Sequence, residues 1–234
     1  MIHVSSSGQK QKLKNESWYD EKLLHFGFSL GVNTMDFNIT PSQTPLDTTY
    51  NDLTYLNPEV SNLMPGINIQ IVTDLRTGKY FDIRFLPGLS LGQRYIRFYK
   101  INPNKDLNKK PLVFEDKDQQ RLGSSFLEFP LLLKFKGDRL NNVRPYFIGG
   151  LNYRYDLAGG KENDDIKLKR PDLYYELGAG LDFYLTYFKL SVELKMSNGI
   201  GDVLDRNAVP LNPQYLDAIK NMKSQIWVLA FHFE

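Results

Sequence analysis

The sequence contains no cysteine among its 234 residues, which excludes structural disulfides and thiolate metal sites. It contains no run of about eighteen apolar residues, which excludes a transmembrane helix but not a membrane barrel, because barrel strands have a much weaker hydropathy signal. Neither sign of charge dominates, since Lys and Arg total 29 and Asp and Glu total 27. The net charge of +2 gives no electrostatic basis for binding nucleic acid.

The start of the chain also lacks the apolar core of a signal peptide. This absence indicates either a protein that is not exported or a mature or engineered form. Residues 1–22 are polar, and we expect them to form a flexible tail. Residues 23–234 are expected to form one domain.

Residues 188–197, FKLSVELKMS, alternate between apolar and polar side chains. A period of two predicts a strand, because successive side chains of a strand point to opposite faces. The same alternation recurs along the chain and predicts eight strands. They are expected near 23–36, 65–74, 80–100, 122–136, 143–157, 172–184, 188–197 and 224–234.

The connections between the predicted strands alternate in length. Short turns follow the second, fourth and sixth strands, and long loops follow the others at 37–62, 101–121, 158–171 and 200–223. In the last loop, residues 212–223 are compatible with a short helix that begins at Pro213. Short turns at one rim, long loops at the other and an even strand number are typical of an outer-membrane barrel. We therefore expect an all-β fold, an eight-stranded antiparallel up-and-down transmembrane β-barrel.

The polar faces of these strands carry equal numbers of acids and bases, interleaved with glycine. They are Asp82, Glu128, Asp156, Glu176, Asp182, Glu193, Arg84, Arg94, Lys134, Arg154, Lys189 and Lys195. A narrow barrel interior needs small residues, and it tolerates charges when they are paired. We therefore expect this set to form an ion-paired network inside the barrel, with the apolar rows facing lipid and aromatic rings near the strand ends.

Two alternatives and one difficulty remain from the pattern alone. A soluble lipocalin-like barrel or a β-sandwich would reverse the faces, with the apolar rows inside and the charges in water. The difficulty is that Pro87 and Pro130 lie within predicted strands, where each removes a ladder donor. Bulges at the two prolines are the expected accommodation.

Histidine is scarce, and two of the three residues lie on the predicted interior face. His25 opens the first strand and His232 closes the last, and we expect them to form an interior pair in a hydrogen-bond network. A metal site is the alternative, with Glu234 as a third ligand. Ser29 and His25 share a face, which leaves open a lipid-modifying enzyme. No cofactor motif is present, eight strands are too few for an aqueous channel, and we expect no enzymatic activity.

Several segments carry more than a pattern. They are PGINIQIVTDLRTGKYFDIRFLPGLSLGQR at 65–94, LEFPLLLKFKG at 127–137, RPYFIGGLNYRYDLA at 144–158, YYELGAGLDFYLTYFKLSVELKMSNGI at 174–200 and the terminal FHFE. Together they resemble the PorT family, small outer-membrane barrels of Bacteroidota, over about residues 63–234. The ending AFHFE is also similar to the C-terminal β-signal of outer-membrane proteins, with Glu234 in place of the final aromatic.

The resemblance implies a component of the type IX protein secretion system, the export route tied to gliding motility. It implies no catalytic residues. We expect a scaffold or accessory subunit that contacts lipid and other secretion or periplasmic proteins, with both termini and the short turns in the periplasm. A structural outer-membrane barrel without a secretion role remains the alternative within the same fold.

Overall fold

The computed structural model describes residues 15–16, 18–42, 55–60, 64–101, 119–158, 166–207 and 213–234. Its strands are β1 (Leu24–Pro41), β2 (Tyr55–Val60), β3 (Pro65–Arg76), β4 (Phe81–Phe85), β5 (Gly88–Ile101), β6 (Gln119–Lys136), β7 (Val143–Asp156), β8 (Pro171–Tyr184), β9 (Lys189–Gly199) and β10 (Ile219–Phe233). A 3₁₀ turn, η1 (Tyr19–Glu21), precedes β1, and a short helix, α1 (Pro213–Asp217), precedes β10. No helix in these ranges is long and apolar enough to cross a membrane.

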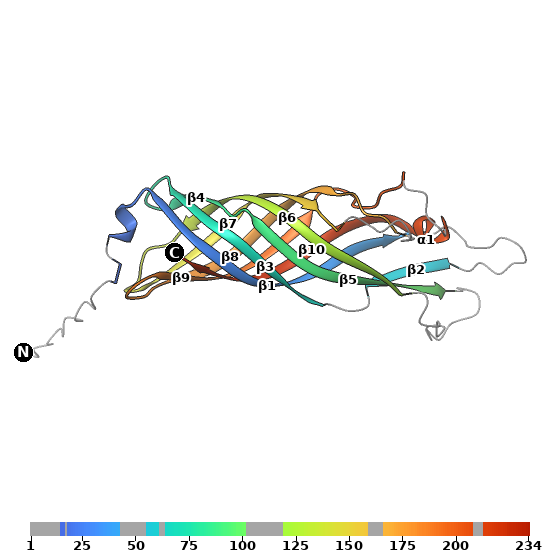
Figure 1. Ribbon diagram of the computed structural model, residues 1–234, viewed down its shortest axis with the longest axis horizontal. Coiled ribbons are helices and arrows are strands. Elements are labelled where there is room, and N and C mark those ends of the chain that lie inside the picture. The colour runs from blue at the N-terminus through green and yellow to red at the C-terminus, as the bar shows by residue number, and fades with distance from the viewer. Residues whose placement is uncertain are drawn as a thin grey trace, which may run out of the picture.

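The strands close into a ring. The first long strand, β1, pairs with β3 on one side and with the last strand, β10, on the other, and all pairings are antiparallel. Around the rest of the wall each strand pairs with its sequence neighbour, and β4 and β5 follow one another as two halves of a single wall strand between β3 and β6. The predicted eight-stranded antiparallel barrel is therefore confirmed (Figure 1).

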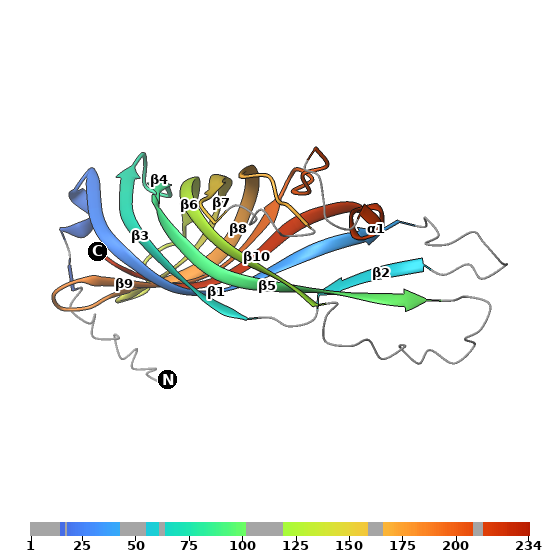
Figure 2. The ribbon, with the colours of Figure 1, turned by 45° about the vertical axis from the view of Figure 1, so that its right-hand side comes forward.

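The two rims differ, as the loop lengths predict. At one end lie η1, the C-terminus and the short connections that follow β3, β6 and β8 (Figure 1). At the other end β1, β5 and β10 continue beyond the ring, and Figure 2 shows α1 and β2 beside these extensions. Below, the two ends are called the short-turn rim and the long-loop rim.

The break between β4 and β5 contains Pro87. Thr73 pairs with Phe85 before the break and Gln70 pairs with Gly88 after it, so the register is the same on both sides. At Pro130 the pairing between β6 and β7 also continues without a shift. The predicted bulges at Pro87 and Pro130 are therefore wrong, because the wall accommodates the missing donors by a two-residue gap in the ladder.

Two further differences concern the long-loop rim. The strand β2 lies within a segment that the sequence pattern assigns to a loop, and it extends the wall by pairing with β5. The helix predicted over 212–223 is only five residues long, and Ile219 already pairs with Pro41 of β1. The isolated helical turn is short because a paired strand satisfies the backbone groups that a longer helix would otherwise satisfy.

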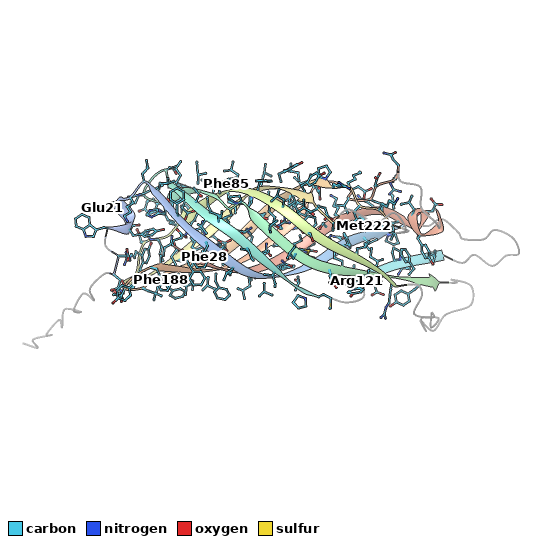
Figure 3. The ribbon with its side chains drawn as sticks, viewed as in Figure 1. Glu21, Phe28, Phe85, Arg121, Phe188 and Met222 are labelled. Atoms are coloured by element: carbon cyan, nitrogen blue, oxygen red, sulfur yellow. The ribbon has the colours of Figure 1, made fainter. Side chains whose placement is uncertain are left out.

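The outer wall is apolar between the two rims. Exposed apolar side chains, here called the outer band, include Phe28, Leu30, Val32, Ile67, Ile69, Ile71, Leu89, Leu91, Leu131, Leu133, Leu151, Leu177, Leu194, Leu229 and Phe231. Toward the short-turn rim aromatic rings pair on this surface, as in the stacked rings of Phe28 and Phe233, 4.8 Å apart. Figure 3 shows Phe28, Phe85 and Phe188 at this part of the wall. An exposed apolar band with aromatic rings at its edge is the surface that a bilayer requires.

The polarity of the two faces reverses along β1. From Leu24 to Val32 the outward side chains are apolar and the inward ones are small or polar. Beyond Asn33 the outward residues are polar, whereas Met35 and Phe37 are buried inside. An apolar core fills the interior at the long-loop rim, formed by Phe37, Leu56, Ile96, Phe98, Leu122, Ile166, Val203, Leu204, Ala218, Ile219 and Met222. The wall thus changes from a membrane pattern to that of a water-exposed barrel.

Candidate functional site

The barrel interior between the rims is filled with charged side chains. All twelve residues assigned to the interior from the alternation pattern are buried: Asp82, Glu128, Asp156, Glu176, Asp182, Glu193, Arg84, Arg94, Lys134, Arg154, Lys189 and Lys195. They come from β4 to β9, and each lies on the face of its strand opposite the outer band. The cost of burying these charges is offset only by close pairing, so their partners determine what the interior does.

The first cluster lies toward the short-turn rim and is centred on Arg84. The Arg84 guanidinium donates two hydrogen bonds of 2.6 Å to the Asp74 carboxylate and one of 2.9 Å to Glu234. Lys189 also binds Glu234, at 2.8 Å. Beside this group the Lys134 ammonium lies between the two oxygens of Asp182, at 2.9 and 3.0 Å. These contacts involve residues of five strands, β3, β4, β6, β8 and β9, and Glu234 directly after β10.

The second cluster lies deeper and is centred on Arg154. Arg154 contacts Glu128 at 2.9 Å and Glu176 at 3.0 Å. Lys195 reaches the other oxygen of Glu176 at 2.9 Å, and Gln70 donates to Glu128 at 2.8 Å. Every carboxylate of this cluster therefore receives bonds from at least two side chains. These paired and buried side chains fill the interior as a plug.

Glu193 lies between the two clusters, 3.5 Å from Arg84 and 4.0 Å from Lys195. The other three of the twelve predicted residues lie outside both clusters. Asp82 pairs with Lys136 at 2.7 Å near the short turns. Asp156 accepts hydrogen bonds from the backbone N–H groups of residues 125 and 158. Arg94 donates to Ser224 at 2.9 Å, and its guanidinium lies 4.2 Å from the centre of the Phe37 ring, directly below the apolar core. It marks the boundary between the two interior regions.

The two interior histidines do not form a pair. The register places His232 opposite Ser29, four residues along β1 from His25, which corresponds to roughly 13 Å of strand. His232 instead faces Glu193, with 3.5 Å between Nε2 and Oε2, and His25 stacks on Tyr19 with 3.8 Å between ring centres. The strands of a barrel are staggered relative to one another, so residues near the ends of adjacent strands need not lie at the same height.

Neither alternative chemistry finds support in the geometry of these residues. Among the described residues, no group of three or more His, Asp or Glu side chains is arranged to hold a metal ion. Glu234 is engaged by Arg84 and Lys189. Ser29 is 1% exposed, beneath the outer band, so its hydroxyl does not face a lipid substrate.

Part of the N-terminal segment is docked at the short-turn rim. The Tyr19 hydroxyl donates to Glu234 at 2.6 Å and accepts from Lys189 at 2.6 Å. Asp20 binds Arg144 through two hydrogen bonds of 2.7 and 2.8 Å. Residues 1–14 and 17 of the expected tail lie outside the described residues. The part from Trp18 to Lys22 is docked on the barrel, in contrast to the flexible tail expected for residues 1–22.

Docking of the N-terminal segment shifts the pKa values of Tyr19 and Asp20, the two residues that make the contacts. Burial raises the pKa of the Tyr19 phenol, and the neighbouring Glu234 carboxylate raises it further, so Tyr19 stays protonated as a donor. Burial also raises the pKa of Asp20, but the hydrogen bonds and charge of Arg144 outweigh it and hold this pKa below its ordinary value of 3.8. Asp20 is therefore an anion at neutral pH and pairs with the cation at the rim.

Some interior residues do not stand out in the sequence. Asp74 lies at the end of a predicted strand, although its parity with Asn68 and Gln70 places it on the interior face. Tyr146 binds Glu193 at 2.8 Å and contacts Lys134 through its ring. Outer-membrane barrels also carry aromatic residues on the lipid face, and only the alternation along β7 distinguishes the two positions.

Comparison with known proteins gives a family and a set of similar folds. The sequence model described as "Outer membrane protein beta-barrel domain" matches residues 8–205. No curated protein matches the sequence.

Among solved structures, Neisserial surface protein A is 12% identical with a TM-score of 0.44, covering 89% of this chain and 97% of that one. Ail of Yersinia pestis, in complex with the heparin analogue sucrose octasulfate, is 10% identical with a TM-score of 0.37, covering 89% and 96%. The outer-membrane protein AlkL in DMPC lipid bilayers is 12% identical with a TM-score of 0.36, covering 99% and 97%.

Proposed function

The chain belongs to the outer membrane protein β-barrel domain family, and from this premise we propose that it is a non-enzymatic scaffold or accessory subunit of the type IX secretion system. The observation that carries the scaffold role is the filled interior. Two ion-paired clusters occupy the membrane-spanning part, and the apolar core closes the long-loop rim. A barrel filled in this way offers no path for a protein cargo, so its contribution to export would come from its surfaces.

The secretion role is supported by the resemblance to the PorT family over about residues 63–234. The segments that carry it, LEFPLLLKFKG and RPYFIGGLNYRYDLA, form the adjacent strands β6 and β7. Both strands supply interior cations, Lys134 and Arg154, that bind acids from other strands. The same segments therefore build the plug on which the scaffold role rests.

The orientation we propose places the short-turn rim and both termini in the periplasm. Short periplasmic turns and longer outer loops are the arrangement of bacterial outer-membrane barrels. The docked segment around Tyr19 would then face periplasmic partners. Exposed rings and apolar side chains at this rim, including Trp18, Leu140 and Tyr187, offer a contact surface for them.

The absence of enzymatic activity is part of the proposal. Ser29 is buried and opposite His232, and His25 is covered by Tyr19. The alternative lipid-modifying enzyme would need both groups open to an acyl chain. Strains that carry Ser29→Ala or His25→Ala should therefore retain full function.

Deletion of the gene tests the proposal. We expect type IX cargo to accumulate in the periplasm, while the permeability of the outer membrane to detergent stays unchanged. Complementation with the wild-type chain and with Ser29→Ala should restore secretion equally. Normal cargo secretion in the deletion strain would assign the protein to the structural barrels without a secretion role, and loss of function in Ser29→Ala would favour an enzyme. Cross-linking and co-purification from detergent-extracted envelopes would then identify the partners.

A further inference from the structure

We propose that a groove at the long-loop rim binds the phosphorylated headgroup of an outer-leaflet lipid, lipid A. The groove has a volume of about 560 Å³ and lies on the outer side of the wall above β7 and β8. Its lining consists of Tyr155, Lys167, Leu168, Lys169, Arg170, Pro171, Asp205 and Asn207. Three cations thus line one groove.

The local backbone holds these cations in place. Ile166 is fully buried and Leu168 packs against the apolar core, so the alternating neighbours Lys167 and Lys169 are directed away from it. The segment is fixed by backbone hydrogen bonds of 2.8 Å from Lys169 N–H to the residue 203 carbonyl and from the residue 156 N–H to the Arg170 carbonyl. A third bond of 2.9 Å joins the residue 205 N–H to the Lys167 carbonyl. The ammonium groups therefore project from an anchored strand-like segment.

The described lining of the groove carries a net positive charge. Among the described residues that line it, Asp205 is the one acid, and its carboxylate accepts the N–H of Asn207. Nearby, Asp202 is paired with Arg206 at 3.5 Å. Lys169 donates to the Asp202 backbone carbonyl, at 2.9 Å, so its charge is not neutralised by that contact. The positive charges of Lys167, Lys169 and Arg170 outnumber the single negative charge of Asp205. An anion with several oxygens can accept hydrogen bonds from all three cations.

The position of the groove identifies the anion as a lipid headgroup. Tyr155 pairs with Pro171 at the base of the groove. Farther from the groove along β7 and β8, the next pairs of outward-facing residues are Tyr153 with Leu173 and then Leu151 with Tyr175. All four of these lower side chains are exposed on the outer band. Acyl chains lying along this apolar column would place a phosphate at the level of the cations. A soluble anion would use the cations alone and would gain nothing from the column.

Native mass spectrometry of the detergent-purified full chain, with lipid A or phosphatidylethanolamine added, tests the inference. We expect lipid A to be retained more strongly than phosphatidylethanolamine. The double variant Lys167→Gln/Arg170→Gln should weaken lipid A binding by about tenfold, because two charge-assisted contacts are lost. The matched control Lys223→Gln/Arg121→Gln removes the same charges from exposed positions of β10 and β6 outside the groove and should bind as the wild type does (Figure 3 labels Arg121).

Equal losses in the two double variants would overturn the inference, because binding would then follow overall charge. Equal retention of the two lipids by the wild type would overturn it as well, as would full competition by inorganic phosphate. A shift in heat-modifiable gel migration would reveal a variant that fails to fold, and the single variant Lys167→Gln then provides the measurement. The inference uses the proposed orientation, but the assay does not depend on secretion, so its failure is distinguishable from failure of the secretion role.

Discussion

Tyr19 donates a hydrogen bond of 2.6 Å to Glu234, although 215 positions separate the two residues in the sequence. Lys189 binds both partners, at 2.6 Å to the phenol and 2.8 Å to the carboxylate. The Tyr19 ring covers His25 and meets Tyr184 edge-on. The segment before β1 is thereby tied to the end of β10 at the short-turn rim.

Replacing Tyr19 by phenylalanine should destabilise the barrel. The ring would remain, but the Glu234 carboxylate and the Lys189 ammonium would each lose a partner. We expect a loss of about 1.5–3 kcal/mol in the free energy of unfolding, measured by urea titration in detergent micelles. Tyr187→Phe is the matched control, because Tyr187 is 90% exposed, and it should leave stability unchanged. Equal effects of the two variants would show that the hydrogen bonds of Tyr19 contribute nothing.

Removing one member of a buried ion pair should be far more damaging than removing both. Lys134→Met leaves the Asp182 carboxylate buried without its ammonium, and we expect a loss of about 3–5 kcal/mol. The double variant Lys134→Met/Asp182→Asn should recover much of this loss. Lys79→Met, whose partner Asp138 lies 3.9 Å away at the exposed surface, should cost about 0–1 kcal/mol. Additive effects in the Lys134 and Asp182 cycle would contradict the pairing.

An arginine on the outer wall should report the position of the bilayer. Leu131 is 57% exposed in the middle of the outer band, and Leu131→Arg should cost about 2–4 kcal/mol in lipid vesicles. Asn38, on the outward face of β1 beyond the band, is the control, and Asn38→Arg should cost about 0–1 kcal/mol. The difference should disappear if the outer band does not contact lipid. Folding titrations of both variants in the same vesicles provide the comparison.

The contact between Asp20 and Arg144 should make the docking of the N-terminal segment pH-dependent. The pKa of Asp20 in the folded protein lies below the ordinary value of 3.8, so the unfolded chain binds its proton first as the pH falls. The stabilisation is fully present above 3.8 and is lost as the pH falls through the folded value. Asp20→Asn should remove this component from the pH profile of the unfolding midpoint, whereas Asp138→Asn should leave it. Superimposable profiles for the wild type and Asp20→Asn would count against the contact.

The ring of strands could be predicted because the alternation signal is repeated in every wall strand. In residues 188–197, once one alternating row is assigned to the lipid face, the orientation of all ten side chains follows. The same decision placed all twelve charged residues inside. Parity is therefore sufficient to assign faces wherever a strand is regular.

The alternation along a strand does not show how far along the barrel axis a residue lies, or which residues of other strands it contacts. The four-residue offset between His25 and His232 follows from the stagger of the strands, which no local pattern encodes. The alternation also does not predict the reversal of the two faces beyond Asn33, because the apolar row changes sides without a break in it. The docking of Tyr19 depends on contacts with β9 and β10 and has no local signal at all.

Spin labelling tests the orientation of the two faces most directly, because the chain has no cysteine and each introduced thiol is unique. Leu194→Cys lies in the outer band on β9, and Asn38→Cys lies beyond it on β1. In lipid vesicles we expect the label at position 194 to collide with dissolved oxygen and to be shielded from a water-soluble nickel complex, with the opposite result at position 38. Free access of the nickel complex to position 194 would contradict the assignment of the apolar rows to lipid.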